Sequence, residues 1–427
     1  MAYEITTGFK TIDPNTSNTQ DLGSRYITKD YLLDVYPNLA SSTGNRTAPG
    51  LWGWGTNNRW NLGLNNLGYY SSPVQVGALA NWKQVNIGSA FAVAIKTDGT
   101  MWSWGWNNTN TAALGQNTIL ATVYYSSPVQ IGALTTWKSI EVAGFKTHAI
   151  KTDGTLWAWG DNNRGALGIT NIITQYYSSP VQVGALTTWK QMGISSTANA
   201  ADFSLALRND GALFAWGDNR FGELGINTVA TLYYSSPIQV GALTNWKQAA
   251  CGGSQTGYFA AAVKTDGTLW SWGANMMGQL GHGTQSATTY YSSPIQVGAL
   301  TSWKSVVLAG NQCYAIKTDG TLWVWGWNGD SGVLGLNTSS TTLYYSSPVQ
   351  VGALTNWKYI RCGDRIPSVM AIKTDGTLWT WGSNASGQLG LNNLTYYSSP
   401  VQVGTLTTWK SVAIYGSTTM AIQDGYI

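Results

Sequence analysis

Histidine is the side chain that most often acts as a general acid or base near neutral pH, and this chain has two, His148 and His282. The two lie far apart and in different parts of an internal repeat. His148 takes a position that Val93 fills in the first copy, which favours a histidine packed in the core. Neither is accompanied by a Ser-His-Asp motif, a phosphate-binding loop or zinc-ligand spacing. The sequence therefore predicts no catalytic residues and no enzymatic activity.

Carboxylates and thiols could instead bind a metal. Asp161 and Asp218 occupy the same loop position in neighbouring copies, so a calcium site on these loops is conceivable. Most other acids belong to repeated Asp-Gly turns, which need Asp for conformational reasons. The cysteines, Cys251, Cys313 and Cys362, lie far apart without CxxC spacing and are interpreted as buried free thiols. We therefore expect no metal and no cofactor.

Charge and hydropathy argue against two classes of partner. The formal net charge is +4, and charged residues make up 10% of the 427 residues. Most basic residues fall in two repeated positions, so they are spread around a ring and should not form the single patch that nucleic-acid binding needs.

No apolar stretch reaches the ~18 residues of a membrane span. No signal peptide is visible at Met1–Glu4. We expect a protein that is soluble when made, with no nucleic-acid partner and no membrane insertion.

The elements that position these residues come from a repeat of about 54 residues, which occurs seven times. Each copy holds the string Tyr-Tyr-Ser-Ser-Pro, and a Trp-Lys pair follows it. The tryptophans of these pairs are Trp82, Trp137, Trp189, Trp246, Trp303, Trp357 and Trp409.

One copy predicts four short antiparallel strands. In the first copy these are Pro73–Val76, Trp82–Ile87, Phe91–Lys96 and Thr100–Trp104. A Thr-Asp-Gly turn between the last two is a strong hairpin signal. Four strands repeated at this period are typical of one propeller blade. The fold predicted is all-β, a closed seven-bladed β-propeller of four-stranded blades.

The two ends of the chain predict how the ring closes. The last copy stops after Ala421-Ile422-Gln423 and lacks its Leu-Trp-x-Trp-Gly strand, whereas the first such strand, residues 51–55, has no copy before it. We expect residues 51–55 to lie in the last blade beside the C-terminus, which removes free sheet edges. In Leu-Trp-x-Trp-Gly the two indoles lie on one strand face and are expected to pack between blades. The propeller then spans residues 50–427.

Residues 1–49 contain no Trp and little apolar sequence, and they are predicted to form an extended N-terminal arm. A short helix capped by Thr28 could form within it. Two interpretations stay open, a segment packed on the propeller itself and an arm that docks on another protein. The candidate anchoring residues are Tyr26, Ile27, Tyr31, Leu32 and Val35.

The repeat resembles a known family. Trp-Gly-x-Asn-x-x-Gly-x-Leu-Gly occurs at residues 159–168, 272–281 and 381–390, after Asp-Gly-x-Leu-x-x-Trp-Gly. These motifs are similar to those of the regulator of chromosome condensation repeat family of seven-bladed propellers. That resemblance implies the same fold, closed by an N-terminal strand. It does not extend to nucleotide exchange, because no copy carries an insertion long enough for the hairpin wedge on which exchange depends.

The near-identical copies also look like propellers that tailed bacteriophages encode as virion structural proteins, and residues 21–32 look like the leader of such proteins. This likeness implies a head-decoration, fibre or tail-associated protein, located in the virion and made in the host cytoplasm. Its partners would be other virion proteins of the capsid, neck or tail, and homo-oligomers are possible. The alternatives are a glycan-binding host-attachment protein, which would contact a host-surface glycan or protein, and a cellular interaction hub of the nucleotide-exchange type.

Contacts with a partner are expected where the copies differ, in the loops after Trp-Gly and before Tyr-Tyr. Aromatic and basic residues in such loops could bind a protein or a glycan. Packing of these loops against a neighbouring blade is the competing interpretation. The candidate contacts are Trp60, Trp106, Arg220, Phe221, Met276, Met277 and Trp327.

Overall fold

The computed structural model describes two separate units of the chain. In the first, only backbone strands within residues 3–27 are described: β1 (Tyr3–Ile5) pairs with β4 (Arg25–Ile27), and β2 (Lys10–Ile12) pairs with β3 (Thr19–Asp21). In the second, residues 50–424 are described except 79–80, 108–110, 119–122, 171–175, 196–202, 230–232, 255–256, 330, 341 and 365. The helix expected after Thr28 and the side chains of the anchoring candidates Tyr26, Ile27, Tyr31, Leu32 and Val35 lie outside the described residues.

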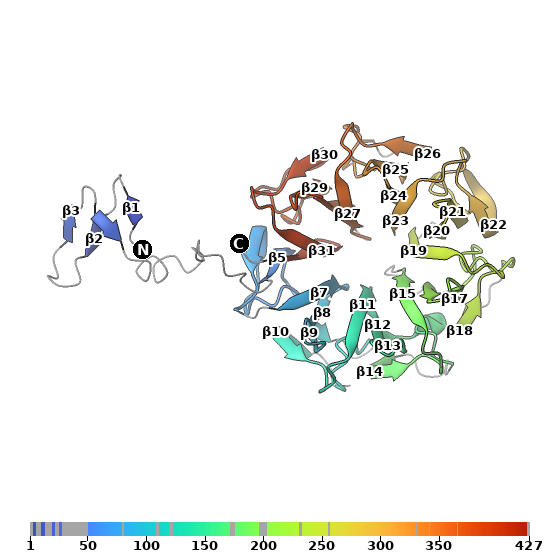
Figure 1. The fold of residues 1–427 in the computed structure, drawn as a ribbon, viewed down its shortest axis with the longest axis horizontal. Coiled ribbons are helices and arrows are strands. Elements are labelled where there is room, and N and C mark those ends of the chain that lie inside the picture. Colours follow the sequence, from blue (N-terminus) through green and yellow to red (C-terminus); the bar gives the residue numbers. More distant parts are fainter. Residues whose placement is uncertain are drawn as a thin grey trace. The chain divides into compact units, whose positions relative to one another are not determined.

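Residues 50–424 form seven four-stranded antiparallel sheets arranged in a ring (Figure 1). Each blade runs outward from the centre, so that in the blade that starts at residue 82 the order is β7, β8, β9 and β10. The strands are β7 (Trp82–Ile87), β8 (Phe91–Lys96), β9 (Met101–Asn107), β10 (Val123–Gln130); β11 (Trp137–Ala143), β12 (Lys146–Lys151), β13 (Leu156–Asp161), β14 (Tyr176–Gln182); β15 (Trp189–Ile194), β16 (Phe203–Arg208), β17 (Leu213–Asp218), β18 (Tyr233–Gln239); β19 (Trp246–Ser254), β20 (Gly257–Lys264), β21 (Leu269–Asn275), β22 (Ser286–Gln296); β23 (Trp303–Ala309), β24 (Gln312–Lys317), β25 (Leu322–Trp327), β26 (Tyr344–Gln350); β27 (Trp357–Cys362), β28 (Ser368–Lys373), β29 (Leu378–Gly382), β30 (Tyr397–Gln402); β31 (Trp409–Tyr415), β32 (Thr418–Gln423), β5 (Gly50–Thr56) and β6 (Tyr69–Gln75). Within the described residues, a 3-10 turn, η1, covers Asn163–Gly165.

The predicted closure of the ring is confirmed. Strand β5 lies between β32 and β6 in the last blade, and Leu51 pairs with Ile422. The N-terminal part of the propeller thus provides the two outer strands of this blade, β5 and β6. The prediction placed only residues 51–55 there. The innermost strands of neighbouring blades contact one another around the whole circle, including β31 with β7.

The point in the repeat at which a blade begins differs from the prediction. The Pro-Val-Gln-Val segment was expected to open a blade, but it ends a strand that begins at Tyr69 and forms the outer edge of the preceding blade. The reason is that the connection between blades is the Gly-Ala-Leu-Thr segment that follows it. A blade therefore starts at Trp-Lys and ends with Tyr-Tyr-Ser-Ser-Pro.

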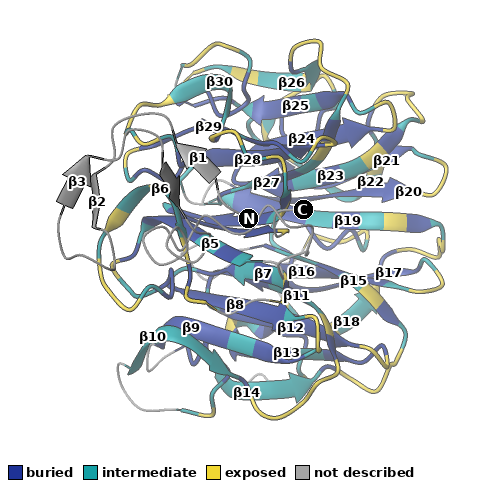
Figure 2. Cartoon of the chain, turned by 60° about the vertical axis from the view of Figure 1, so that its left-hand side comes forward, coloured by how far each residue is buried: buried dark blue, intermediate teal, exposed yellow. Residues whose placement is uncertain are grey.

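Buried residues run along the strands of the blades (Figure 2), and the buried tryptophans among them hold adjacent blades together. The second tryptophan of each Leu-Trp-x-Trp-Gly strand is fully buried, and its indole N–H donates to a backbone carbonyl of the preceding blade. Trp54 donates to the oxygen of Gln388 over 2.8 Å, so this contact also joins the two ends of the ring. The equivalent donors in the other blades are Trp104, Trp159, Trp216, Trp272, Trp325 and Trp381. In five blades the first tryptophan, such as Trp102, is half-buried and donates to a threonine of its own blade, and in β17 Phe214 takes this position.

The repeated Ser-Ser-Pro segment has a second joining role. The N–H of Asn65 donates to the carbonyl of Ser126 in the next blade over 3.0 Å, and at the closure Asn392 donates to Ser71 over 2.7 Å. The backbones of the two blades approach each other closely at Gly387, and this position requires glycine. Its φ is +75°, and an added Cβ would lie 2.7 Å from Ser71 Cα. The repeated sequence therefore encodes the contacts between blades as well as the blades themselves.

Candidate functional site

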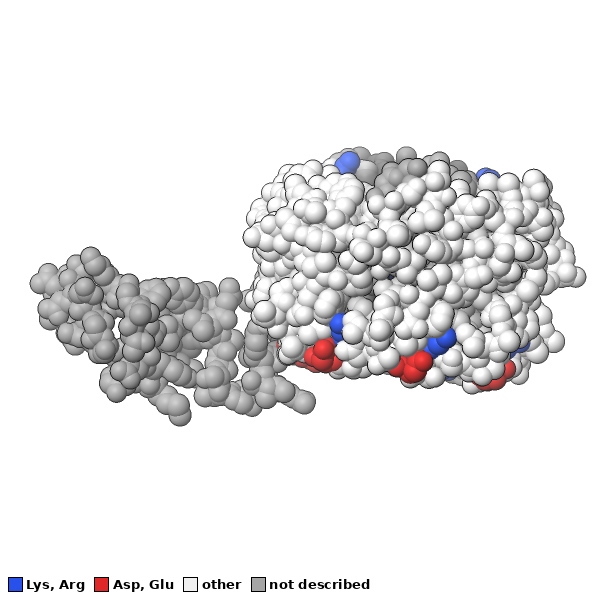
Figure 3. All heavy atoms as spheres, turned by 90° about the horizontal axis from the view of Figure 1, so that it is seen from above, with Lys and Arg blue, Asp and Glu red and all other residues white. Residues whose placement is uncertain are grey.

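The propeller has two faces that differ in chemistry. We call the face with the seven hairpins between second and third strands the turn face, and the opposite one, with the loops after the third strands, the loop face. A side view shows acidic side chains gathered along one edge of the disc (Figure 3). The Asp residues of the hairpin turns lie on the turn face, and the variable aromatic residues lie on the opposite, loop face.

On the loop face, Trp60 and Trp106 come together, although they are 46 positions apart. Both contact Tyr124: the ring centroids are 4.5 Å apart for Trp60 and 6.5 Å apart for Trp106. Phe145 packs on the other side of Trp106, and the guanidinium of Arg59 lies 4.2 Å from its ring centroid. These ring contacts join loops of successive blades. Trp60 and Trp106 are half-buried, so they contribute to blade packing and part of each ring stays exposed.

A second cluster surrounds Phe221. Its ring lies 5.9 Å from Tyr258 and 5.1 Å from Tyr290, again across a blade boundary. The neighbouring Arg220 pairs with the buried Asp218 at 2.8 Å, and Arg164 reaches the same carboxylate at 3.3 Å. The Asp218 carboxylate therefore pairs with two arginines. These ion pairs take the place of the calcium site that the sequence made conceivable at this position.

The remaining loop candidates stand apart from these clusters. Met276 and Met277 are half-buried, and the Met277 N–H donates to the side chain of Gln279 over 2.7 Å. Trp327 is half-buried at the end of β25. Sequence reasoning missed Arg59, Tyr124 and the tyrosines of the second cluster. Tyr124 and Tyr290 belong to the repeated Tyr-Tyr pair, and only their contacts with variable loops distinguish them, whereas Tyr258 takes a variable position that Ala90 fills in the first copy.

The histidines occupy structural positions. His148 is fully buried, and burial lowers its pKa to about 3, so the ring is neutral. His282 Nε2 lies 2.9 Å from the hydroxyl of Ser271, but that hydroxyl donates to the Leu280 carbonyl and is fully buried. In another blade the side chain of Gln116 donates to Ser103 in the same way. A glutamine in place of the histidine shows that this contact supports the loop.

The cysteines are free, as predicted. Cys251 and Cys313 are buried and Cys362 is half-buried. Burial raises the pKa of all three thiols, which makes them poor nucleophiles. Among the described residues no group of three or more His, Cys, Asp or Glu side chains has the geometry to hold a metal ion. No described helix is long and apolar enough to cross a membrane.

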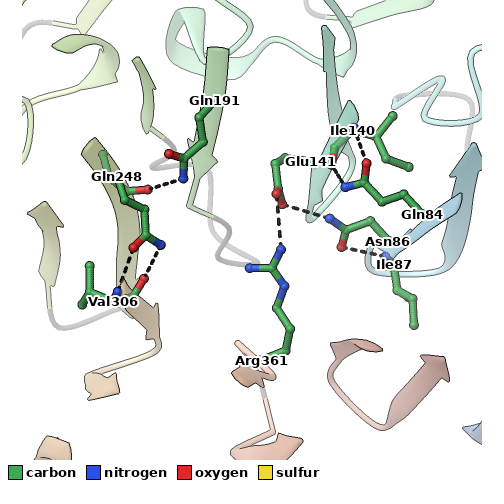
Figure 4. A network of polar contacts seen from close by, with 10 residues as sticks. Gln84, Asn86, Ile87, Ile140, Glu141, Gln191, Gln248, Val306 and Arg361 are labelled. Carbon is green, nitrogen blue, oxygen red and sulfur yellow. Dashed lines mark hydrogen bonds and ion pairs between the residues drawn. The ribbon is translucent and has the colours of Figure 1, made fainter. Parts of the chain in front are cut away.

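The central channel holds polar side chains that are not repeated from blade to blade (Figure 4). The carboxylate of Glu141 on β11 accepts a hydrogen bond from Asn86 over 2.9 Å and pairs with Arg361 on β27 at 3.3 Å. Strands β11 and β27 belong to blades that are three steps apart in the ring of seven, so this ion pair crosses the channel. Sequence analysis did not identify it, because nothing local links residues 220 positions apart.

Glutamine side chains link neighbouring innermost strands around the same channel. The Gln84 side chain both donates to the carbonyl of Ile140 and accepts from its N–H, over 2.6 and 3.1 Å. Gln248 makes the same pair of bonds to Val306. Each amide therefore copies a backbone pairing between inner strands that are too far apart to pair directly. The described channel residues therefore offer charged and amide groups that can hold a ligand.

Comparison with known proteins agrees with this architecture. Residues 50–421 match the family described as the RCC1-like domain. The Ultraviolet-B receptor UVR8 of Arabidopsis thaliana is 28% identical over 347 residues, which cover 79% of this chain and 74% of the receptor. The probable E3 ubiquitin-protein ligase HERC6 of Homo sapiens is 32% identical over 259 residues, 59% of this chain and 24% of that protein.

Among solved structures, Prp20p from Saccharomyces cerevisiae superposes with a TM-score of 0.74 at 20% identity, covering 89% of this chain and 92% of Prp20p. At this identity the similarity concerns the fold. The match and the structure agree on the propeller fold.

Proposed function

Because the chain belongs to the RCC1-like domain family, we propose that it is a non-catalytic binding platform. The observation that supports this most directly is the distribution of variable residues. Near-identical blades build a closed ring, and the copies differ on the loop face and in the channel. A closed ring is ordered before it meets a partner, so little conformational entropy is lost on binding.

Relatives support a role in protein binding. Prp20p has binding properties toward Gsp1p and histones. The half-buried clusters around Trp106 and Phe221 offer aromatic and arginine surface of the kind that dominates protein interfaces. We do not extend the proposal to the specific partners of Prp20p, since the identity is 20%.

More specifically, we propose that this chain is a virion structural protein of a tailed bacteriophage, displayed as a head-decoration, fibre or tail-associated component. The support is the regularity of the blades and the likeness of residues 21–32 to phage leader segments. Residues 1–49 would attach the propeller to capsid, neck or tail proteins, since Met1–Thr47 fall outside the compact unit Ala48–Asp424.

Protein identification in purified particles tests this role. We expect the chain to be found in particles of the encoding phage, and a variant lacking residues 1–49 to be lost from them while its propeller stays folded. Strand β5 begins at Gly50, so this deletion leaves the ring intact. Full incorporation of the truncated propeller would contradict attachment through the arm, and absence of the wild-type chain from particles would contradict the virion role.

A glycan-binding attachment protein is the second candidate, favoured by the partly exposed pair Trp60 and Trp106. Binding on a glycan array that is lost in Trp60→Ala but kept in Tyr124→Ala, with both variants still folded by circular dichroism, would support it over a purely structural role.

A further inference from the structure

Each blade carries a lysine at a specific irregularity of its innermost strand. Trp82 pairs with Lys96 and Gln84 pairs with Ile95, so Lys83 is an extra residue without a partner in the ladder. Such a β-bulge re-aims a side chain and is a fixed feature of a fold. The same register shift occurs at the Trp-Lys pair of all seven blades.

These bulge lysines are kept while their strand changes around them. The residue after Lys is Gln, Ser or Tyr, and the later positions range from Gly to Arg. All seven lysines are exposed, so packing within the blade does not require them. They are Lys83, Lys138, Lys190, Lys247, Lys304, Lys358 and Lys410.

The other repeated charges of the turn face compensate each other. Lys151 lies 3.6 Å from the ring centroid of Trp157, and its charge helps to lower the pKa of Asp153, after the larger effect of hydrogen bonds from Thr155. This arrangement recurs in other blades, for example with Lys317 and Asp319. The bulge lysines differ: among the described residues an ion pair is found only between Lys410 and Asp424, at 3.1 Å.

The bulge lysines surround one mouth of the channel, since they lie at the start of the innermost strands. Lys247, Lys304 and Lys358 line a cavity of about 510 Å³ in the channel. Arg361 lines it too and lies three residues beyond Lys358, which is about 10 Å deeper along a strand. The ion pair of Arg361 with Glu141 crosses the channel there and limits its depth.

We propose that this ring of lysines binds a compact ligand that carries several phosphate groups. Ammonium groups bind phosphate oxygens through charge-assisted hydrogen bonds, and a ring converging on a cavity can engage several phosphates of one molecule. A nucleic-acid strand fits less well. The lysines converge on one mouth of the channel, whereas the repeated charges farther from the axis compensate each other and add no net positive charge along which a backbone could lie.

Calorimetric titration of the full chain with inositol hexakisphosphate, inorganic tripolyphosphate and inorganic phosphate tests the proposal. We expect binding of the first two that weakens with added salt, and none detectable for the single phosphate. The triple variant Lys247→Gln, Lys304→Gln, Lys358→Gln should bind at least about tenfold more weakly, because it loses the ammonium groups that line the cavity. Circular dichroism checks that each variant is folded.

A charge-matched control separates a specific site from general attraction. The variant Lys10→Gln, Lys29→Gln, Arg46→Gln removes the same number of positive charges from residues 1–49 and should bind within about twofold of wild type, since the proposed site is formed by lysines of the propeller. Equal losses in both triple variants would overturn the proposal, and so would the absence of binding to either polyphosphate. Duplex DNA that competes as well as inositol hexakisphosphate would overturn it in favour of nucleic acid. These outcomes are independent of the virion role.

Discussion

A chain that begins at residue 57 is expected not to form the cooperative fold that a chain beginning at residue 50 forms. The shorter chain lacks β5, which lies between β32 and β6 in the last blade. It loses the fully buried Leu51 and Trp54 and the Trp54 bond to Gln388 that joins the two ends. The unpaired edges of β32 and β6 are then exposed and prone to aggregation.

Thermal and urea unfolding of the two chains measures this effect, and point variants refine it. Trp54→Ala should cost about 3–5 kcal/mol, as expected for a large side chain removed from a core. Trp52→Ala is the matched control on the same strand, and it should cost less because Trp52 is half-buried. Unfolding midpoints that are the same for chains starting at 50 and 57 would mean that β5 does not close the ring.

Glu223→Gln is expected to stabilise the protein at pH 8 and to leave its stability nearly unchanged at pH 4.5. Glu223 is fully buried; one carboxylate oxygen accepts the N–H of Phe221 over 2.7 Å and the other has no partner among the described residues. Burial raises its pKa from 4.5 to about 8, and the nearby Asp218 adds to the shift. In two other blades Gln279 and Gln388 accept the same type of bond.

The direction of the pH dependence follows from the pKa of Glu223 in the unfolded chain and in the native state. Below pH 4.5 the carboxyl is protonated in both states, and its contribution to stability is fully present. Between pH 4.5 and about 8 the unfolded chain releases a proton that the native state retains, so the native state loses stability as the pH rises. One pKa unit corresponds to about 1.4 kcal/mol, so the loss is at most about 5 kcal/mol.

Urea unfolding of wild type and Glu223→Gln at several values between pH 4.5 and 8 checks this. The reciprocal variant Gln388→Glu is the control, because it places a carboxyl in the equivalent position and should acquire the same pH dependence. Parallel stability curves for wild type and Glu223→Gln would show that the carboxyl is not held protonated.

The fold could be predicted because repetition removes ambiguity. One Trp-Lys strand such as Trp82–Ile87 is a weak signal, but seven copies at a constant period require a ring, and the incomplete last copy locates the closure at Leu51. The point at which a blade begins was missed because Pro73 suggests a strand entry, whereas the strand starts at Tyr69. The bulge had a signal that local pattern reasoning overlooked: the buried Trp82 and Val85 are three residues apart, which breaks the alternation of a strand.

The candidate site could be predicted only in part. Variable loops indicated Trp60 and Trp106, but their shared contact with Tyr124 depends on how successive blades are placed. The channel pair of Glu141 and Arg361 depends on the geometry of the whole ring, and neither residue stands out in its own copy. Pairwise contacts of this kind need the three-dimensional arrangement.

Hydrogen–deuterium exchange at Leu51–Gly55 tests the closed ring most directly. These residues form the third strand of the last blade, as Met101–Gly105 do in a blade built from continuous sequence. With a closed ring, the amides of both segments should exchange at similarly slow rates. Fast exchange at residues 51–55 beside a protected 101–105 would contradict closure by the N-terminal strand, and with it the rigid platform on which the proposed function depends.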